Sequence, residues 1–129
     1  MAAESAHEIG KKLVELCNSG KSMEAMEQLY AKDIVSIEPH GGPEMPAKMQ
    51  GIDKVRGKGE WWYKNHTIHE FKATGPYPHG DRFIVLFHVD ITPKAGPMAG
   101  KRVTFQEAGL YMVKSGKVAQ EEFFYHMGG

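Results

Sequence analysis

The sequence FIVLFHVDI at residues 83–91 alternates between two kinds of position. Its odd-numbered residues are all apolar, whereas the even-numbered ones change from Ile84 and Leu86 to His88 and Asp90. A period of two is typical of a β-strand with one buried face. We therefore predict a strand whose odd-numbered side chains pack inward. The apolar part of its other face indicates a surface that a second subunit covers.

The second half of the chain repeats this period. Strands are predicted near residues 67–74, 82–92, 101–113 and 117–126. Gly75–Gly80 and Pro93–Pro97 are rich in glycine and proline, which predicts turns between the first three strands. Ser115-Gly116 predicts a tight hairpin between the last two.

The first half has helical spacing instead. The first predicted helix follows a capping box at Ser5–Glu8 and ends at residues 18–20. The second follows a Ser22 cap and has Tyr30 on its packed face. The third runs from an Asp53 cap to about Asn65. A short strand at residues 34–38 lies between the second and third helices, followed by a loop with three prolines at residues 39–46. Helices grouped first and strands grouped last predict an α+β fold, with an antiparallel sheet and helices on one face.

Length and composition predict one globular domain over residues 1–129. Hydrophobic residues make up 41% and charged residues 25%, which excludes disorder, and the single cysteine excludes an intrachain disulfide. Sixteen basic and sixteen acidic residues cancel, so neither nucleic acid nor a membrane surface is an expected partner. No apolar run is long enough to span a membrane, and Glu4, His7 and Glu8 lie where a secretory signal would be apolar. We expect a cytoplasmic protein.

Two acidic residues are candidates for catalysis. Glu107 is the acid in an otherwise apolar stripe of its strand, so it is paired, protonated or directed into a wet cavity unless a bulge turns it outward. In a cavity it could serve as a general acid or base with a raised pKa. Glu38 ends the first strand, where it either reaches a pocket mouth or is solvated.

Other kinds of catalytic site have little support. His66 and His69 straddle a helix end and a strand start, and no HExxH motif occurs, so no metal is predicted. Cys17 lies on the apolar face of the first helix, where it packs as a small hydrophobic residue. No phosphate-binding glycine loop is complete. No cofactor is predicted.

Taken together, these elements resemble the SnoaL-like branch of the nuclear-transport-factor-like superfamily, which includes polyketide cyclases and ketosteroid isomerases. The resemblance covers nearly the whole chain and rests on the opening helices, on YAKDIVSIEP at residues 30–39, on Gly51-Ile52-Asp53 and on LYMVKSGKV at residues 110–118. It implies a cone, in which a strongly curved antiparallel sheet wraps around a pocket closed by three helices. It also implies a homodimer formed through the outer sheet face.

The resemblance also implies site residues. The segment Glu38-Pro39-His40-Gly41 matches the acid-Pro-x-Gly segment in which ketosteroid isomerases carry their base, and Tyr30 matches a tyrosine eight residues earlier. The positions of the isomerase oxyanion donors hold Leu13 and Gly109, which have no side-chain donor. The implied catalytic pair is Glu38 and Glu107. The implied ligand pocket is lined by Tyr30, His40, Trp62, Phe87, Phe105, Tyr111, Glu121, Phe123 and Tyr125.

Two functions remain open from the sequence. The first is a cofactor-independent isomerase, cyclase or dehydratase in which Glu38 removes a proton beside the carbonyl of an apolar compound, and Glu107 or a tyrosine is the donor. The second is a non-catalytic domain that binds a small apolar or aromatic ligand or acts as a dimeric interaction domain. In either case, Met45 and Met49 suit the loop at residues 39–50 to a lid, the alternative being an ordinary surface loop.

Overall fold

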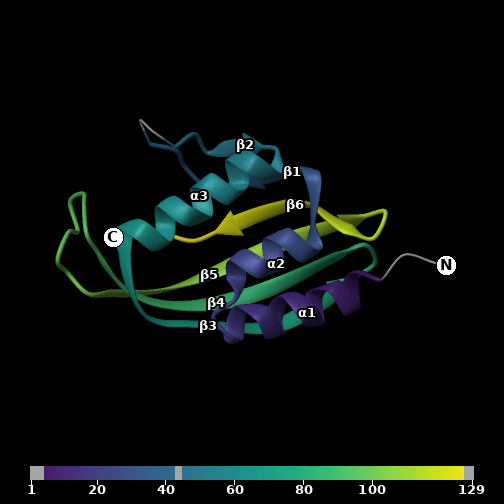
Figure 1. Ribbon diagram of the computed structural model, residues 1–129. Helices are drawn as coiled ribbons and strands as arrows, with labels where there is room; N and C mark the ends of the chain where they lie inside the picture. The colour runs from purple at the N-terminus through teal and green to yellow at the C-terminus, as the bar shows by residue number, and fades with distance from the viewer. Residues whose placement is uncertain (1–4, 43–44, 127–129) are drawn as a thin grey trace.

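A curved six-stranded sheet, covered by three helices on its concave side, forms the protein (Figure 1). The computed structural model describes residues 5–42 and 45–126. The helices are α1 (Ala6–Asn18), α2 (Ser22–Leu29) and α3 (Ile52–Asn65). The strands are β1 (Tyr30–Ile37), β2 (Lys48–Gln50), β3 (His66–His79), β4 (Arg82–Pro93), β5 (Val103–Lys114) and β6 (Lys117–Phe124).

The strand order across the sheet is β2-β1-β6-β5-β4-β3. All neighbouring strands are antiparallel except β1 and β6, which are parallel and bring Ser36 beside Glu121. The predicted α+β fold, a curved sheet wrapped by three helices from the first half of the chain, is confirmed. The parallel pair is a departure from the predicted antiparallel sheet, and it arises because the first strand returns to lie beside the last.

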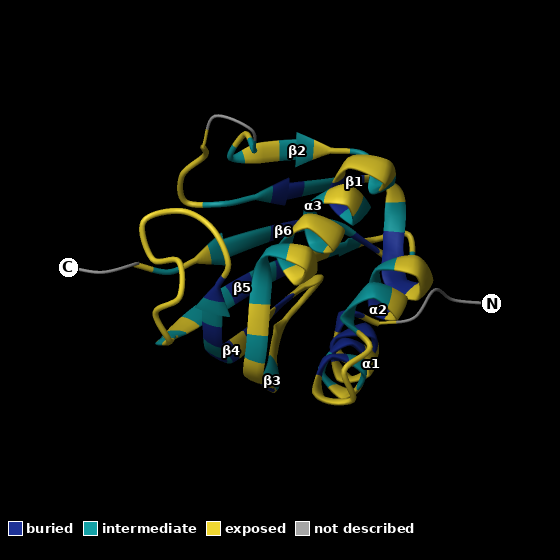
Figure 2. Cartoon of the chain, turned by 60° about the vertical axis from the view of Figure 1, so that its left-hand side comes forward, coloured by how far each residue is buried: buried dark blue, intermediate teal, exposed yellow. Residues whose placement is uncertain are grey.

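The core lies between the concave face of the sheet and the helices (Figure 2). The odd-numbered residues 83–91 of β4 are all buried, as their alternation predicts. Ile9, Leu13 and Cys17 of α1 are buried in the same core. On the opposite face of β4, Ile84 and Leu86 remain 39% and 40% exposed.

The helix starts differ from two of the three predicted caps. The Ser5 hydroxyl does cap α1, accepting a hydrogen bond of 3.2 Å from the backbone N–H of Glu8. Ser22, however, is the first residue of α2, and its Oγ has no hydrogen-bond partner among the described residues. Gly51, with φ of 100°, precedes α3, so Asp53 lies within the first helical turn rather than at the cap. There its carboxylate faces the positive end of the helix dipole.

The strand boundaries also differ. β1 begins at Tyr30, which was predicted to end the second helix. β3 continues through Gly75 and Pro76 with a shift in register, because a bulge lets the chain resume pairing up to His79. Part of the predicted 39–50 lid loop forms β2, which pairs with β1. Residues 43–44 of that loop lie outside the described part of the chain.

The remaining turns and helices fit the sequence. Ser115 and Gly116 both have positive φ, 52° and 78°, as a two-residue hairpin of the primed type requires. The Asn18 side chain joins the end of α1 to β3, because its amide donates to the Ala73 carbonyl and accepts from the Ala73 N–H. None of the helices in the described residues is long and apolar enough to cross a membrane.

We predict that Gly10→Ala destabilises the protein by about 1–3 kcal/mol, although alanine favours a helix. A Cβ at Gly10 would lie 2.7 Å from Cβ of Pro76 and 3.1 Å from the Phe83 ring, and the rigid proline ring cannot yield. Gly57→Ala in α3 is the matched control. Its Cβ would meet nothing within 4 Å, so it should stabilise by about 0.5–1 kcal/mol. Urea unfolding measures both, and a stabilising Gly10→Ala would contradict the packing argument.

Candidate functional site

The register of the sheet gathers polar side chains on its concave face. Glu107 of β5 lies opposite Phe87 of β4, and Glu121 of β6 lies between Tyr111 of β5 and Ser36 of β1. α3 covers this part of the face. Because β1 is far in sequence from the hairpin of β5 and β6, the site exists only in the folded chain.

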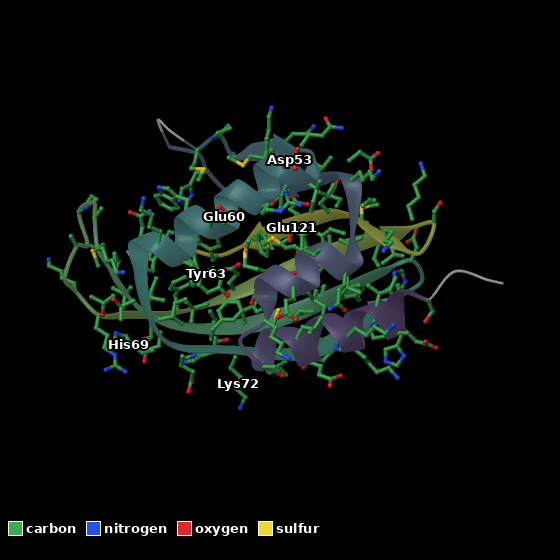
Figure 3. All side chains as sticks on the ribbon, viewed as in Figure 1. Asp53, Glu60, Tyr63, His69, Lys72 and Glu121 are labelled. Atoms are coloured by element: carbon green, nitrogen blue, oxygen red, sulfur yellow. The ribbon has the colours of Figure 1, made fainter. Side chains whose placement is uncertain are left out.

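Glu121 is the most deeply buried acid, with 2% of its surface exposed. Figure 3 shows it in the interior between the helices and the sheet, whereas His69 and Lys72 project outward from β3. Tyr30 donates a short hydrogen bond to one carboxyl oxygen, and Ser36 donates to the other at 2.7 Å. Burial raises the pKa of Glu121, while Lys58, Tyr30 and Ser36 act in the opposite direction.

Lys58 of α3 joins this pair to a second acid. Its Nζ donates to the Ser36 hydroxyl at 2.7 Å and forms an ion pair with Glu38. Both side chains of the pair are mostly buried, at 21% and 19% exposed. Tyr125 donates to the other oxygen of Glu38 at 2.8 Å. A continuous chain of contacts therefore connects Tyr125, Glu38, Lys58, Ser36, Glu121 and Tyr30.

Glu107 is the unpaired acid of this site. Across residues 5–42 and 45–126 its carboxyl group has neither a hydrogen bond nor an ion pair. Burial, with a further contribution from the negative charges of Glu38 and Glu121, raises its pKa to about 8 against a smaller opposite effect of Lys58. At neutral pH the group is therefore mostly protonated and able to donate.

Aromatic rings surround these groups. Phe105 and exposed His40 both contact the Tyr125 ring, each at 5.9 Å between ring centres, and the Lys58 ammonium lies 5.3 Å from the centre of Phe123. A further stack extends from Phe87 to Phe71, at 5.2 Å, and on to Trp62 at 6.0 Å. The surroundings of the acids are thus apolar, which increases the cost of ionising them.

The structure brings most of the predicted site residues together on the concave side. Tyr30, Tyr111 and Glu121 lie deepest, whereas His40 is at the surface. Sequence reasoning missed Ser36 and Lys58. A signal for Lys58 existed, because it lies three residues after Val55 and four before Trp62, on the packed face of the helix.

The two positions that lack oxyanion donors are filled by packing. Leu13 is buried in the core, and a Cβ at Gly109 would lie 2.7 Å from the Tyr111 ring. Any donor to a developing oxyanion must come from another residue. Glu107, Lys58 and Tyr125 are groups of the site that can supply one.

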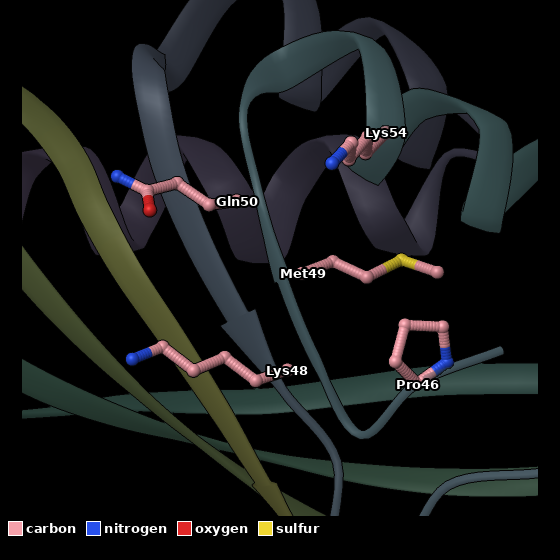
Figure 4. A pocket seen from close by; sticks show the side chains of 5 residues that line it. All are labelled: Pro46, Lys48, Met49, Gln50 and Lys54. Carbon is pink, nitrogen blue, oxygen red and sulfur yellow. The ribbon is translucent and has the colours of Figure 1, made fainter.

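Shallow hollows lie away from this cluster on the surface of the described residues. One lies between β2 and the start of α3, lined by Pro46, Lys48, Met49, Gln50 and Lys54 (Figure 4). Another lies on the outer sheet face around Leu86 and His88. Among the described residues no group of three or more histidine, cysteine, aspartate or glutamate side chains could hold a metal ion.

We predict that Glu107→Gln stabilises the protein at pH 9 by at least about 1 kcal/mol and changes little at pH 5. A folded-state pKa near 8, above the ordinary value of 4.5, means that the folded protein holds a proton that the unfolded chain releases. Stability is therefore lost as pH rises from about 4.5 to about 8, and glutamine removes this loss.

Thermal melts at pH 5, 7 and 9 test this difference. Glu60→Gln, at an exposed position of α3, is the control and should show no comparable change with pH. Equal stability of Glu107→Gln and the parent protein at pH 9 would mean that Glu107 is solvated.

The comparisons with known proteins agree with this architecture. The sequence matches the SnoaL-like domain family over residues 4–125. A candidate SnoaL-like polyketide cyclase from Mesorhizobium loti is 42% identical, with a TM-score of 0.87 over 95% of this chain and 100% of that one.

More distant structures share the fold. An NTF2-like protein from Burkholderia thailandensis is 20% identical, with a TM-score of 0.79 over 95% of this chain and 92% of that one. A protein of ketosteroid isomerase-like fold from Catenulispora acidiphila is 17% identical, with a TM-score of 0.68 over 93% and 86%. No functionally curated protein matches. The family match and the 42% identity show that this chain belongs to the SnoaL-like domain family.

Proposed function

We propose that this protein is an isomerase- or cyclase-type enzyme that acts on an apolar carbonyl compound by carboxylate acid–base catalysis. The observation that carries the proposal is that two neighbouring acids, Glu38 and Glu107, differ in their interaction partners. Glu38 forms an ion pair with Lys58 and accepts a hydrogen bond from Tyr125, whereas Glu107 has no partner among the described residues and a pKa of about 8. Acids whose environments separate their protonation states are suited to opposite roles in one reaction.

In the proposed reaction, Glu38 takes a proton from the carbon beside the carbonyl. The C–H electron pair forms a new C=C bond, and the carbonyl π electrons move to oxygen, which receives the Glu107 proton. In an isomerisation, Glu38 gives its proton to another carbon of a conjugated enol while the enol O–H proton returns to Glu107. In a cyclisation, the enol carbon attacks a second carbonyl, whose oxygen receives the proton held by Glu38 while the enol O–H proton returns to Glu107. The ammonium of Lys58 stabilises the negative charge that develops on the carbonyl oxygen during the first step.

The aromatic surroundings support an apolar substrate. Phe105, Phe123 and Trp62 are partly buried on the side where the acids lie. The name of the Mesorhizobium loti relative, a candidate polyketide cyclase, agrees with a carbonyl-containing substrate.

We predict that the protein catalyses deuterium exchange beside the carbonyl of some cyclic ketones or enones, detected by NMR in D₂O. Exchange should fall by about 100-fold or more in Glu38→Gln and in Glu107→Gln, the size expected for loss of a general base or acid. It should also decline above about pH 8, where Glu107 loses its proton.

Glu60→Gln is the control for this assay and should exchange at the parent rate. Ligand binding to the parent protein without any exchange, across a panel of ketones and enones, would favour the second function, a non-catalytic ligand-binding domain. The packed positions Leu13 and Gly109, which offer no oxyanion donor, favour that alternative.

We also propose that two copies pair through the outer sheet face. Exposed apolar side chains gather there on adjacent strands. They are Tyr77, Ile84, Leu86, Met112 and Phe124, each between 36% and 52% exposed. The paired registers place Ile84 beside Tyr77 and Leu110, so the apolar surface crosses three strands. A contiguous patch of this kind is typical of a subunit interface.

We predict a sedimentation mass of about twice 14.4 kDa at micromolar concentration. Leu86→Lys should shift the protein to monomer, because the interface would bury an unpaired charge. Lys72→Met, at an exposed position of neighbouring β3, is a control that introduces no buried charge. A parent protein that sediments as monomer throughout would exclude the dimer.

A further inference from the structure

We propose that Lys58 is the positioning residue of the site. It holds Glu38 directly and Glu121 through Ser36 as hydrogen-bond acceptors, and thereby leaves Glu107 as the acid that keeps a proton. Because it names the residue that assigns the acid and base roles, the inference rests on the proposed function. Its test measures the titration of carboxyl groups and requires no substrate.

The contacts give Lys58 two acids to neutralise. Its ammonium makes an ion pair with Glu38 and donates to Ser36, whose own hydroxyl proton is thereby directed to Glu121. A hydroxyl accepts and donates at once, so Ser36 transmits the orientation set by the lysine. With Tyr30 donating to the second oxygen, Glu121 accepts at both of its carboxyl oxygens.

No other basic side chain of α3 replaces Lys58 in this role, within the part of the chain that the structure describes. Arg56 is held at the surface by Glu27 and Asp53. Lys54 and Lys64 are exposed. Among the described residues, α3 therefore brings one cation, Lys58, to the three carboxyl groups of the site, and full ionisation would leave an excess of negative charge in an apolar setting.

Charge balance then decides which acid stays neutral. Tyr111 and Tyr125 also lie near Glu107, but as neutral phenols they add no positive charge. Two of the three carboxyl groups are connected to Lys58 by hydrogen bonds or an ion pair, and Glu107 is not. An acid without a partner in a buried site takes the proton. Burial raises the pKa of Glu121 as well, but Lys58 and the hydroxyls of Tyr30 and Ser36 all act against that rise, whereas at Glu107 only the more distant charge of Lys58 does. By its contacts with the other two acids, Lys58 therefore favours Glu107 as the neutral one.

The test is a carboxyl ¹³C NMR titration of the full chain, comparing Lys58→Met with the parent protein. Loss of the ammonium should move the midpoints of both Glu107 and Glu121 to higher pH, with Glu121 rising by at least about one unit, a tenfold gain in proton affinity. Lys58→Arg keeps the positive charge and should bring both midpoints back toward the parent values. Lys64→Met is the surface control and should leave them unchanged.

Ser36→Ala provides a second test if Lys58→Met does not fold. It breaks the connection to Glu121 but leaves the Lys58–Glu38 pair, so the Glu121 midpoint should rise while that of Glu107 changes less. Unchanged midpoints in folded Lys58→Met, or an unchanged Glu121 midpoint in Ser36→Ala, would overturn the proposal. Either result would leave the proposed reaction standing if Glu107→Gln still abolished exchange.

Discussion

The ion pair between Lys58 and Glu38 is the interaction on which the interior of this protein depends. It brings a charged helix side chain beneath the helix layer and against the sheet, where a lone charge would be costly. Breaking a buried pair by removing one partner typically costs about 3–5 kcal/mol. Ser36 connects the pair to Glu121, because it accepts a hydrogen bond from Lys58 and donates one to Glu121. Tyr30 donates to the other carboxyl oxygen of Glu121 and is the last member of this network. The same contacts fix α3 against β1 and β6. The packing of the helix on the sheet and the pairing of the buried charges therefore depend on the same side chains.

Most of the fold could be predicted from the sequence because its signals are local. The alternation in residues 83–91 indicates which face of β4 is buried. Ser115-Gly116 provides the residues that a hairpin turn of the primed type requires. The errors concern competition between local and distant interactions. Tyr30 continues the helical pattern, yet pairing with β6 draws it into a strand. Gly75 and Pro76 are typical turn residues, yet they lie within β3 as a bulge, because pairing with β4 continues on both sides of them.

The candidate site could be predicted only in part. Glu107 could be found because a single acid in an apolar stripe is conspicuous within one strand. Lys58 and Ser36 were missed for a different reason. A lysine in a helix and a serine in a strand are ordinary at the surface, and they become significant only when elements distant in sequence bring acids to them. The role of Glu38 rested on family resemblance, and its partners come from α3 and from Tyr125 beyond the last strand.

The parallel pairing of β1 with β6 has a consequence for how the chain is made. Ser36 and Glu121 are separated by 85 positions, so the bond between them can form only after all of the intervening chain has been made. Until then β1 has an unpaired edge, and the helices cover a sheet that lacks its centre. Contacts of such long range slow folding, because a large loop must close before they form. The concave core is therefore completed only when β6 takes its place between β1 and β5.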